Sequence, residues 1–286
     1  MRKILLQLDS DRAPSVFDAI TAYDAGAEVL LQHGGVQPEE VRDLVYGAMF
    51  TRGVGDLKNS AVFIGGTDVA KGEAMLREAR NAFFGPMRVS VMLDANGCNT
   101  TATAAVVKIL SAGDPTAMKV VVLAGTGPVG QRAAALLANE GAEVILTSRT
   151  LERAERVCAA LAERFEVRVT PAAVPDADAT RRVLEGAHAV LCAGAAGVTL
   201  VEETVWRPHA TLRAVADVNA VPPLGAGGVE VTWDGKEIEG KKLFGAIGIG
   251  DFKMKVHRRC IARLFEQNDL VLDAEEIFAL AKELAR

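Results

Sequence analysis

The chain has 286 residues, of which half are hydrophobic and 24% are charged. This length suits two ordinary domains or one large one, since single cores usually stop growing near roughly 250–300 residues. The formal net charge of −5 gives no global attraction to nucleic acid or to an anionic membrane surface. No apolar stretch approaches the ~18 residues of a membrane span, and the N-terminal apolar run is too short for a signal peptide, so we expect a cytoplasmic protein.

The cysteines and histidines are dispersed, without a CxxC pair or a cluster at metal-ligand spacing. They are Cys98, Cys158, Cys192, Cys260, His33, His188, His209 and His257. We therefore predict no metal site, and we expect buried or idle free thiols of a reducing compartment.

The first hundred residues alternate short apolar runs with helical patterns. The apolar runs are KILLQL, EVLLQ, SAVFIGG and RVSVMLD, and the helical patterns cover 14–25, 38–48, 69–83 and 100–110. This alternation is typical of a mostly parallel sheet with helices on both faces.

The first of these helices carries an apolar stripe. Val16, Ile20 and Tyr23 have the i, i+4, i+7 spacing of a buried face. This spacing predicts that Tyr23 belongs to the core and that Asp18 faces outward or toward a cleft.

A breaker cluster, SAGDP at 111–115, predicts a domain boundary. The runs KVVVLAG, EVILTS, VRVT, HAVLCAG and TLRAVADV then alternate with helices near 129–139, 151–165 and 179–185, which is a doubly wound nucleotide-binding pattern. We expect 225–250 to be irregular and the helices 251–266 and 273–285 to pack back on the first domain. The predicted fold is thus α/β with two domains: an α/β substrate domain, 1–113, completed by 251–286, and a Rossmann-type domain, 114–250.

A glycine-rich loop follows the first strand of the second domain. It consists of Gly125, Thr126, Gly127, Pro128, Val129 and Gly130, which match GxGxxG between an apolar strand and a helix. In such loops the glycines permit the tight turn, the approach of a pyrophosphate and the packing of helix on strand. We predict a dinucleotide site, the alternative being a turn that only links strand to helix.

The end of the next strand carries Ser148, Arg149 and Thr150 where an NAD site usually has a carboxylate. A guanidinium can bind the 2′-phosphate of NADP, and the two hydroxyls can donate to the same phosphate. NADP is therefore favoured over NAD. The alternative is that Arg149 is a solvated charge and Thr150 only the N-cap of the next helix.

Several segments together carry a family resemblance. With the glycine loop and the SRT turn, the strings LDANGCNTT, DVNAVPPLGAGG and FGAIGIGDFKMKVHR make the chain resemble the NADP-dependent methylene-tetrahydromethanopterin dehydrogenases of one-carbon metabolism, nearly end to end. The resemblance implies reversible hydride transfer from methylene-tetrahydromethanopterin, and in some members methylene-tetrahydrofolate, to NADP. The methenyl cation formed is delocalised over N–C–N and no substrate proton leaves, so this chemistry needs neither metal nor general base. The resemblance also implies a homo-oligomer, a trimer or hexamer.

Polar residues follow the last strand of the first domain. We predict Asp94 as a catalytic residue and the following positions as pterin-binding, because ligands of open α/β sheets bind outside the carboxyl ends of the strands: Asn96, Asn99, Thr100 and Thr101. A capped helix start, with Asn99 or Thr100 as the N-cap, remains the alternative for any of them.

In the second domain Asp217 and Asn219 end the run TLRAVADV. By position they face the nicotinamide end, so we predict Asn219 as catalytic and Asp217 as substrate-binding. A purely structural role is equally open for Asp217.

Lys253 falls on the lysine that the resemblance carries over as catalytic. A cation beside a forming carbocation raises its energy, so Lys253 would instead position the pterin through a carbonyl or carboxylate, or act with a lowered pKa. The alternative is a helix-surface lysine, as we expect Lys255 to be. His257, at i+4 from Lys253, and Asp18 are predicted pterin-binding residues.

Two other functions compete with this interpretation. A shikimate-dehydrogenase-type NADP enzyme shares the LTSRTLERAE turn, but it would need a Lys/Asp pair in the first domain, and none of Lys3, Lys58 and Lys71 lies at a clear strand end beside an acid. The other is a non-catalytic NADP-binding regulatory protein that kept the glycine loop and lost turnover.

Overall fold

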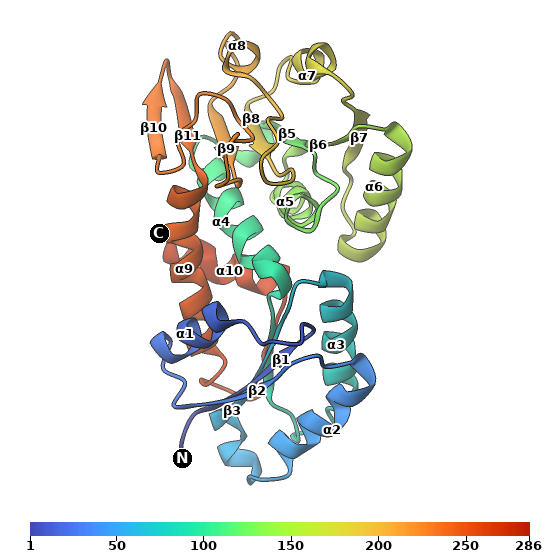
Figure 1. Cartoon of the computed structure of the whole chain (residues 1–286), viewed down its shortest axis with the longest axis vertical. Helices are drawn as coiled ribbons and strands as arrows, with labels where there is room; N and C mark the ends of the chain where they lie inside the picture. The colour runs from blue at the N-terminus through green and yellow to red at the C-terminus, as the bar shows by residue number, and fades with distance from the viewer. The chain divides into compact units, whose positions relative to one another are not determined.

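The computed structural model describes residues 1–286, which fall into two compact units (Figure 1). The first consists chiefly of Met1–Thr100 and Met254–Leu284, and the second of Thr101–Lys253. The first break therefore lies at Thr100 rather than at residue 113, because helix α4, Cys98–Leu110, belongs in part to each unit. The C-terminal residues 254–284 belong to the first unit.

The first unit is built on a five-stranded parallel sheet in the order β12-β4-β3-β1-β2. Its strands are β1 (Ile4–Asp9), β2 (Val29–His33), β3 (Ser60–Gly65), β4 (Ser90–Leu93) and β12 (Val271–Leu272). Its helices are α1 (Val16–Asp24), α2 (Pro38–Met49), α3 (Val69–Asn81) and α10 (Ala274–Leu284), with 3₁₀ turns at Val54–Asn59 and Ala95–Gly97. The alternation of strand and helix predicted for this region is confirmed.

The second unit has a seven-stranded sheet in the order β10-β11-β9-β8-β5-β6-β7. Its strands are β5 (Lys119–Leu123), β6 (Glu143–Ser148), β7 (Thr170–Ala173), β8 (Ala189–Cys192), β9 (Ala214–Asp217), β10 (Asp234–Ile238) and β11 (Lys241–Phe244). The helices are α5 (Pro128–Asn139), α6 (Leu151–Phe165), α7 (Ala177–Val183), α8 (Glu203–Trp206) and part of α9 (Ala246–Arg263), with a 3₁₀ turn at Pro115–Ala117. When only the parallel strands are numbered along the chain, their order in the sheet from β7 to β11 is 3-2-1-4-5-6, which is the doubly wound order of dinucleotide-binding domains.

The segment expected to be irregular contains a β-hairpin. Strands β10 and β11 pair antiparallel, and Ile238 faces Lys241 across a two-residue turn. Both turn residues, Glu239 and Gly240, have positive φ, which is the geometry of the hairpin turns that match strand twist. The Glu-Gly pair is a weaker sequence signal than Asn-Gly, which explains why the hairpin was not predicted.

The prediction of a buried stripe on α1 was wrong. Val16, Ile20 and Tyr23 are 71%, 58% and 53% exposed. The helix buries Thr21 and Ala22 instead, so its small residues face the sheet and its large apolar residues face away from it.

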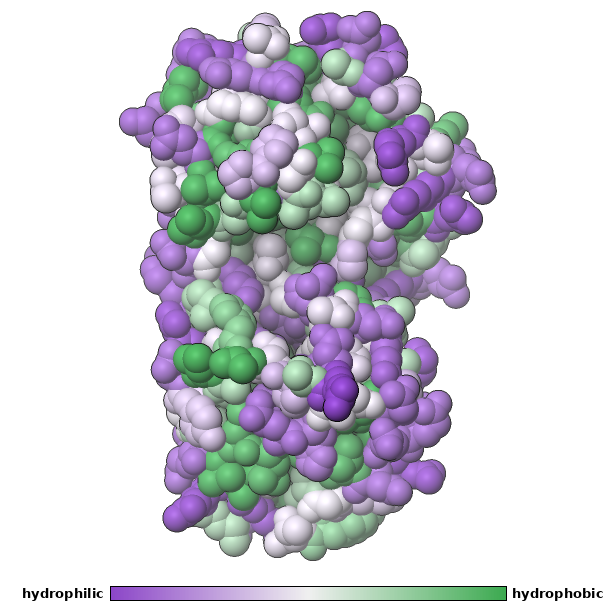
Figure 2. Space-filling view, viewed as in Figure 1, coloured by the Kyte–Doolittle hydropathy of each residue, from purple (hydrophilic) through white to green (hydrophobic).

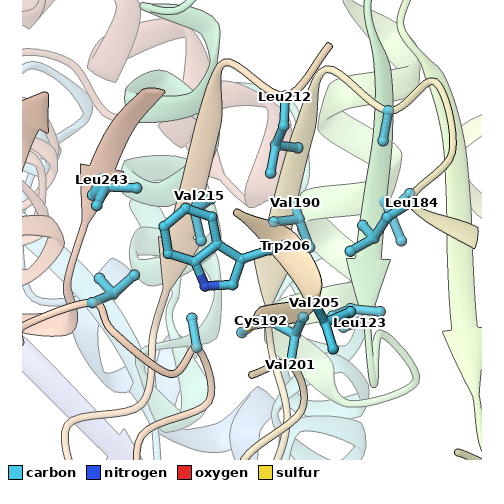
Figure 3. Packing of buried hydrophobic residues seen from close by; sticks show 14 residues of the cluster. Leu123, Leu184, Val190, Cys192, Val201, Val205, Trp206, Leu212, Val215 and Leu243 are labelled. Atoms are coloured by element: carbon cyan, nitrogen blue, oxygen red, sulfur yellow. The ribbon is translucent and has the colours of Figure 1, made fainter. Parts of the chain in front are cut away.

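The core of the second unit gathers around Trp206 of α8 (Figure 3). Its indole is buried, and Nε1 donates to the carbonyl oxygen of Gly227 at 2.8 Å, so its one polar group is satisfied. Six of the labelled neighbours come from β5, β8, β9, β11 and the segment before α8: Leu123, Val190, Cys192, Val201, Val215 and Leu243. As predicted, all four cysteines are free and buried. No helix is long and apolar enough to span a membrane.

Replacement of Trp206 by alanine should lower the free energy of unfolding by roughly 3–5 kcal/mol, because it leaves a cavity among packed side chains. Urea unfolding of the purified protein measures this. Trp206→Phe, which keeps most of the apolar volume and loses only the N–H donor, should cost less. Equal stability of Trp206→Ala and wild type would contradict the packing described.

Candidate active site

The glycine loop of the second unit leaves no room for side chains at two of its three glycines. A Cβ on Gly125 would lie 2.9 Å from side-chain atoms of Leu146 and Val122, and one on Gly130 would lie 2.6 Å from the Cα of Gly125. At Gly127 the nearest atom to an added Cβ would be the carbonyl oxygen of Ala193, at 3.9 Å. The first and third glycines therefore serve close packing, while the second leaves open space beside its backbone.

Helix α5 begins directly on this open space. Gly127 is its N-cap, Pro128 is in its first turn, and no side chain caps it. The free N–H groups of the first turn and the positive end of the helix dipole suit an anionic group. The loop is held by Gln131, whose Nε2 donates to the carbonyl oxygen of Thr126 at 2.7 Å.

A cavity of about 350 Å³ lies beside the loop, at the carboxyl ends of β5, β6 and β7. Ser148, the last residue of β6, and Arg149, the residue after it, line the cavity. That they bind the 2′-phosphate stays a prediction. Arg149 is exposed and forms no ion pair in the structure, whereas Ser148 is buried. No Asp or Glu occupies positions 147–150. The cavity therefore presents a cation and a hydroxyl where an NAD site usually presents a carboxylate.

The third residue of the turn, Thr150, is the N-cap of α6, but its side chain makes no capping hydrogen bond. Thr150 does not line the cavity. Thr150 is thus the N-cap residue of α6, which was the alternative to a role in binding phosphate, and its hydroxyl makes no hydrogen bond with the helix.

The polar atoms of Asp217 and Asn219 are taken up by their own loop. The Asp217 carboxylate accepts the backbone N–H of Asn219 at 2.9 Å and of Ala226 at 3.0 Å. Asn219 donates from Nδ2 to the carbonyl oxygen of Pro223 and accepts the N–H of Val221 at Oδ1. Burial raises the pKa of Asp217, although these N–H groups oppose the rise. This geometry accounts for both residues as supports of the loop 218–226.

In the first unit, Asp94 organises the start of α4. It accepts the backbone N–H groups of Asn99 and Thr100, both at 3.0 Å, and the hydroxyl of Thr100 at 2.6 Å. The side chain of Asp94 therefore caps the first turn of α4, while Asn99 and Thr100 lie inside the helix and are not its N-cap. Asn99 donates from Nδ2 to Leu93 and to the carboxylate of Asp273.

The remaining two residues of this strand end differ in exposure. Asn96 is exposed with a left-handed backbone, φ 54°, and its N–H reaches the carbonyl oxygen of Gly66 at 2.6 Å. Thr101 is half-buried. Neither is brought to Asp94 by a hydrogen bond of its own side chain.

Three predicted residues of the first unit lie together, with Asp18 and Asp94 on either side of the buried imidazole of His257. His257 Nε2 lies 3.9 Å from a carboxylate oxygen of Asp18, and Nδ1 lies 3.9 Å from one of Asp94. The ring stacks on Phe63, with centroids 5.5 Å apart, and Phe17 lies beside it at 6.2 Å. Asp18 therefore faces inward, with its side chain 15% exposed. Two carboxylates and a histidine thus meet at the carboxyl ends of β3 and β4.

Comparison with known proteins identifies the family. The family model described as "Methylene-tetrahydromethanopterin dehydrogenase, N-terminal" matches residues 16–96. A protein of Methylorubrum extorquens named "Bifunctional protein MdtA" is 48% identical over 286 residues, covering 99% of both chains. The chain belongs to the methylene-tetrahydromethanopterin dehydrogenase family. It is therefore an oxidoreductase by family, as the resemblance implied.

A second member of the methylene-tetrahydromethanopterin dehydrogenase family, also from Methylorubrum extorquens, is named "NAD(P)-dependent methylenetetrahydromethanopterin dehydrogenase" and is 32% identical over 294 residues, with 99% of both chains covered. Among solved structures, shikimate 5-dehydrogenase of Listeria monocytogenes has a TM-score of 0.54 at 14% identity, covering 99% of this chain and 96% of its own. Quinate dehydrogenase of Corynebacterium glutamicum has a TM-score of 0.52 at 14% identity, covering 99% and 100%. At this identity the likeness shows the fold alone, a two-domain α/β dehydrogenase architecture.

On α9, Lys253 is half-buried and Lys255 is exposed. Lys253 belongs to the second unit and His257, one helical turn later, to the first. The catalytic role of Lys253 stays a prediction.

Sequence reasoning missed most of the cavity wall. The lining residues not predicted lie around the ends of β5, β6 and β7 and in the segment before α8: Leu123, Ala124, Thr147, Val174, Pro175, Asp176, Ala177, Thr180, Val198, Thr199, Leu200, Val201, Glu202 and Val205. Thr147 also accepts the backbone N–H of Ala124 at Oγ1, which ties β6 to the glycine loop. The position after β7 was a signal that could have found Val174 and its neighbours, since adjacent parallel strands end at one edge.

Asp217→Asn tests the loop role of Asp217. Burial raises the pKa of Asp217 in the folded state above its value in the unfolded chain, so the folded state binds the proton more tightly. This tighter binding adds to the free energy of unfolding at low pH, and the contribution is lost as pH rises through the folded pKa. Asn does not titrate, so Asp217→Asn lacks this contribution. We therefore expect the difference in unfolding free energy between wild type and Asp217→Asn to fall as pH rises above about 4. Urea unfolding at a series of pH values measures it, and a difference independent of pH would contradict the assignment.

Proposed function

We propose that the protein is an NADP-dependent methylene-tetrahydromethanopterin dehydrogenase of one-carbon metabolism, acting in the cytoplasm as a homo-oligomer. The observation that carries the coenzyme assignment is the exposed, ion-pair-free guanidinium of Arg149, beside Ser148 in the cavity at the end of β6. Family membership supports the substrate, since both curated relatives align over nearly their whole length and one is named for this reaction.

The residues of the second unit fit NADP. Gly127 leaves space for a pyrophosphate at the uncapped N-terminus of α5, and the cavity beside it has room for the adenosine half. Arg149 would bind the 2′-phosphate through a charge-assisted contact, with Ser148 and Thr150 as hydroxyl donors. NAD lacks this phosphate and would lose that contact, so we propose NADP as the preferred coenzyme.

NADP, when bound, supplies the acceptor for a hydride. The reaction breaks one C–H bond of the methylene group, both electrons leave with the hydride, and the remaining methenyl carbon shares its positive charge with two nitrogens. Because no proton is released from the substrate, the protein has to position the pterin and to suit a growing cation rather than to supply a base.

The acidic cluster of the first unit suits that demand. Asp18 and Asp94 place two carboxylates around His257, at the strand ends where α/β sheets bind ligands. Carboxylates stabilise nearby positive charge. We therefore retain Asp18, Asp94 and His257 as pterin-site residues, with Asn96, Thr101 and Lys253 as further predictions. Asp217 and Asn219 are better explained as supports of their loop.

The reaction itself is the first test. The purified protein is mixed with methylene-tetrahydromethanopterin and NADP, with methylene-tetrahydrofolate and NAD as parallel arms, and the absorbance of the reduced nicotinamide is followed. We expect reduction in the first arm. If neither pterin reduces either coenzyme, the shikimate-type or the non-catalytic alternative replaces this proposal.

The coenzyme assignment predicts the effect of Arg149→Asp. Loss of a charge-assisted contact, roughly 1.5–3 kcal/mol, should raise the KM for NADP roughly 10- to 150-fold and change the KM for NAD much less. Steady-state kinetics with both coenzymes measure it. Arg168→Asp, which changes an exposed arginine before β7 in the same way, is the matched control and should leave both values near wild type. Equal changes for NADP and NAD in the Arg149 variant would sink the assignment.

If Lys253 positions the pterin, Lys253→Ala should lower kcat and leave the affinity for NADP unchanged. The reason is that a pterin-positioning group acts on the reacting geometry rather than on coenzyme binding. Lys255→Ala, on the exposed side of the same helix, is the control and should keep the wild-type kcat. A Lys253 variant with wild-type kcat would return this residue to the surface-lysine alternative.

A further inference from the structure

The glycines at the start of α9 let this helix approach the segment 230–234 closely. A Cβ on Gly245 would lie 2.1 Å from the carbonyl oxygen of Glu230, and one on Gly248 would lie 2.2 Å from that of Trp233. The two backbones are also joined by a hydrogen bond, in which the N–H of Gly245 donates to the carbonyl oxygen of Trp233 at 2.8 Å. A side chain at either glycine would force them apart. The FGAIGIG string therefore fixes where α9 begins.

Farther along α9, Phe252 is held by a charged residue of another helix. The ammonium group of Lys108, in the last turn of α4, lies 5.3 Å from the centroid of the Phe252 ring, which is a cation–π contact. The carboxylate of Asp234, the first residue of β10, accepts from the same ammonium group, with its oxygens 2.6 Å and 2.9 Å from Nζ. Lys108 thus links α4, β10 and α9.

A second lysine attaches the β10–β11 hairpin to the end of α4. Lys242, on β11, donates from Nζ to the carbonyl oxygen of Ser111 at 2.9 Å. The other charged side chains of β10 differ from Asp234, because Lys236 and Glu237 are exposed and make no ion pair, and Figure 2 shows hydrophilic residues over β10. The end of α4, the hairpin and the start of α9 therefore form one body inside the second unit.

The charge of Lys108 is withdrawn from water. Its side chain is 19% exposed, whereas that of Asp234 is 46% exposed. An ammonium ion loses hydration when it is buried, and an apolar side chain of similar size is often as stabilising as a buried ion pair. The charge therefore adds little to stability. It adds geometry, because a carboxylate and a ring face together define one place for the ammonium group.

We propose that Lys108 is a positioning residue for hydride transfer: by holding Phe252 it fixes the next residue of α9, Lys253, in the orientation that the pterin requires. The proposal rests on the proposed function, in which Lys253 positions the pterin, and it gives Lys108 no contact with substrate or coenzyme. A misplacement of about 1 Å, caused by a change far from the chemistry, can slow a reaction about 100-fold. Lys108 can therefore control kcat through the backbone that carries Lys253.

Lys108→Met tests the proposal, because methionine keeps an unbranched apolar side chain and removes the charge. We expect kcat for oxidation of methylene-tetrahydromethanopterin to fall about 10-fold, as for a misplacement smaller than 1 Å, and the KM for NADP to stay that of wild type. Asp234→Asn, which removes the carboxylate, should lower kcat in the same way. Lys108→Arg, which keeps the charge, should retain most of it.

Lys236→Met is the matched control, since it removes the charge of an exposed lysine on the same hairpin. Its kcat should be that of wild type. A wild-type kcat in Lys108→Met, or an equal fall in the control, would overturn the proposal. Thermal unfolding of all variants should be close to wild type, so that a lower kcat does not reflect unfolded protein.

A double-mutant cycle separates positioning from a general structural effect. Because Lys108 acts through Lys253, Lys108→Met should cause no further fall in kcat when Lys253 is already alanine. If the two substitutions instead lower kcat independently, so that their effects multiply, the proposal is wrong.

Amide hydrogen exchange gives a measurement that needs no turnover. Exchange at 246–253 should be faster in Lys108→Met than in wild type and unchanged in Lys236→Met. Unchanged exchange in the Lys108 variant would overturn the proposal even if kcat falls. A wild-type protein that fails the dehydrogenase assay would refute the proposed function, and exchange would then decide by itself whether Lys108 holds this part of α9.

Discussion

Parallel strands of one sheet have their carboxyl ends at the same edge, and this constraint brings together the candidate residues that follow the strands in each unit. In the second unit it gathers the glycine loop after β5, Ser148 and Arg149 at the end of β6, and the part of the cavity wall after β7. In the first unit it sets Asp94 after β4 near His257 and Asp18. The strands supply a buried support, and the helices α1 and α9 add Asp18 and His257 to the strand-end residue Asp94.

The dinucleotide site could be predicted because its signal is local. Gly125, Gly127 and Gly130 act within one turn, so their spacing along the chain is also their spacing in space. The position of Arg149 could be predicted because one helix and one strand separate it from the same loop. The family could be predicted because several segments agreed in order and spacing, as the 48% identical relative then bore out.

The packing of α1, the role of Asp217 and the cluster around His257 depend on contacts between distant residues, which the spacing of residue types along the chain does not reveal. The spacing of Val16, Ile20 and Tyr23 shows that they share a face, but it does not show that Thr21 and Ala22 face the sheet instead. A structural role of Asp217 was open from the sequence, but its partners could not be predicted, because they are backbone N–H groups up to nine residues away in a loop with no regular pattern. The cluster around His257 joins Asp18 of α1, Asp94 after β4 and His257 of α9, and the last two are 163 positions apart in the chain.

The first unit is discontinuous in sequence, and this affects how it is made. β12 pairs with β4, and Ser90 accepts the backbone N–H of Leu270 and donates to the carbonyl oxygen of Gln267, 177 positions later. At the usual rate of synthesis, the ribosome needs roughly 10–40 s to pass from residue 100 to the end of the chain. The second unit is complete before the first can close. During that interval β4 is paired with β3 but lacks β12, so a newly made chain carries an unpaired apolar strand at this edge of the sheet.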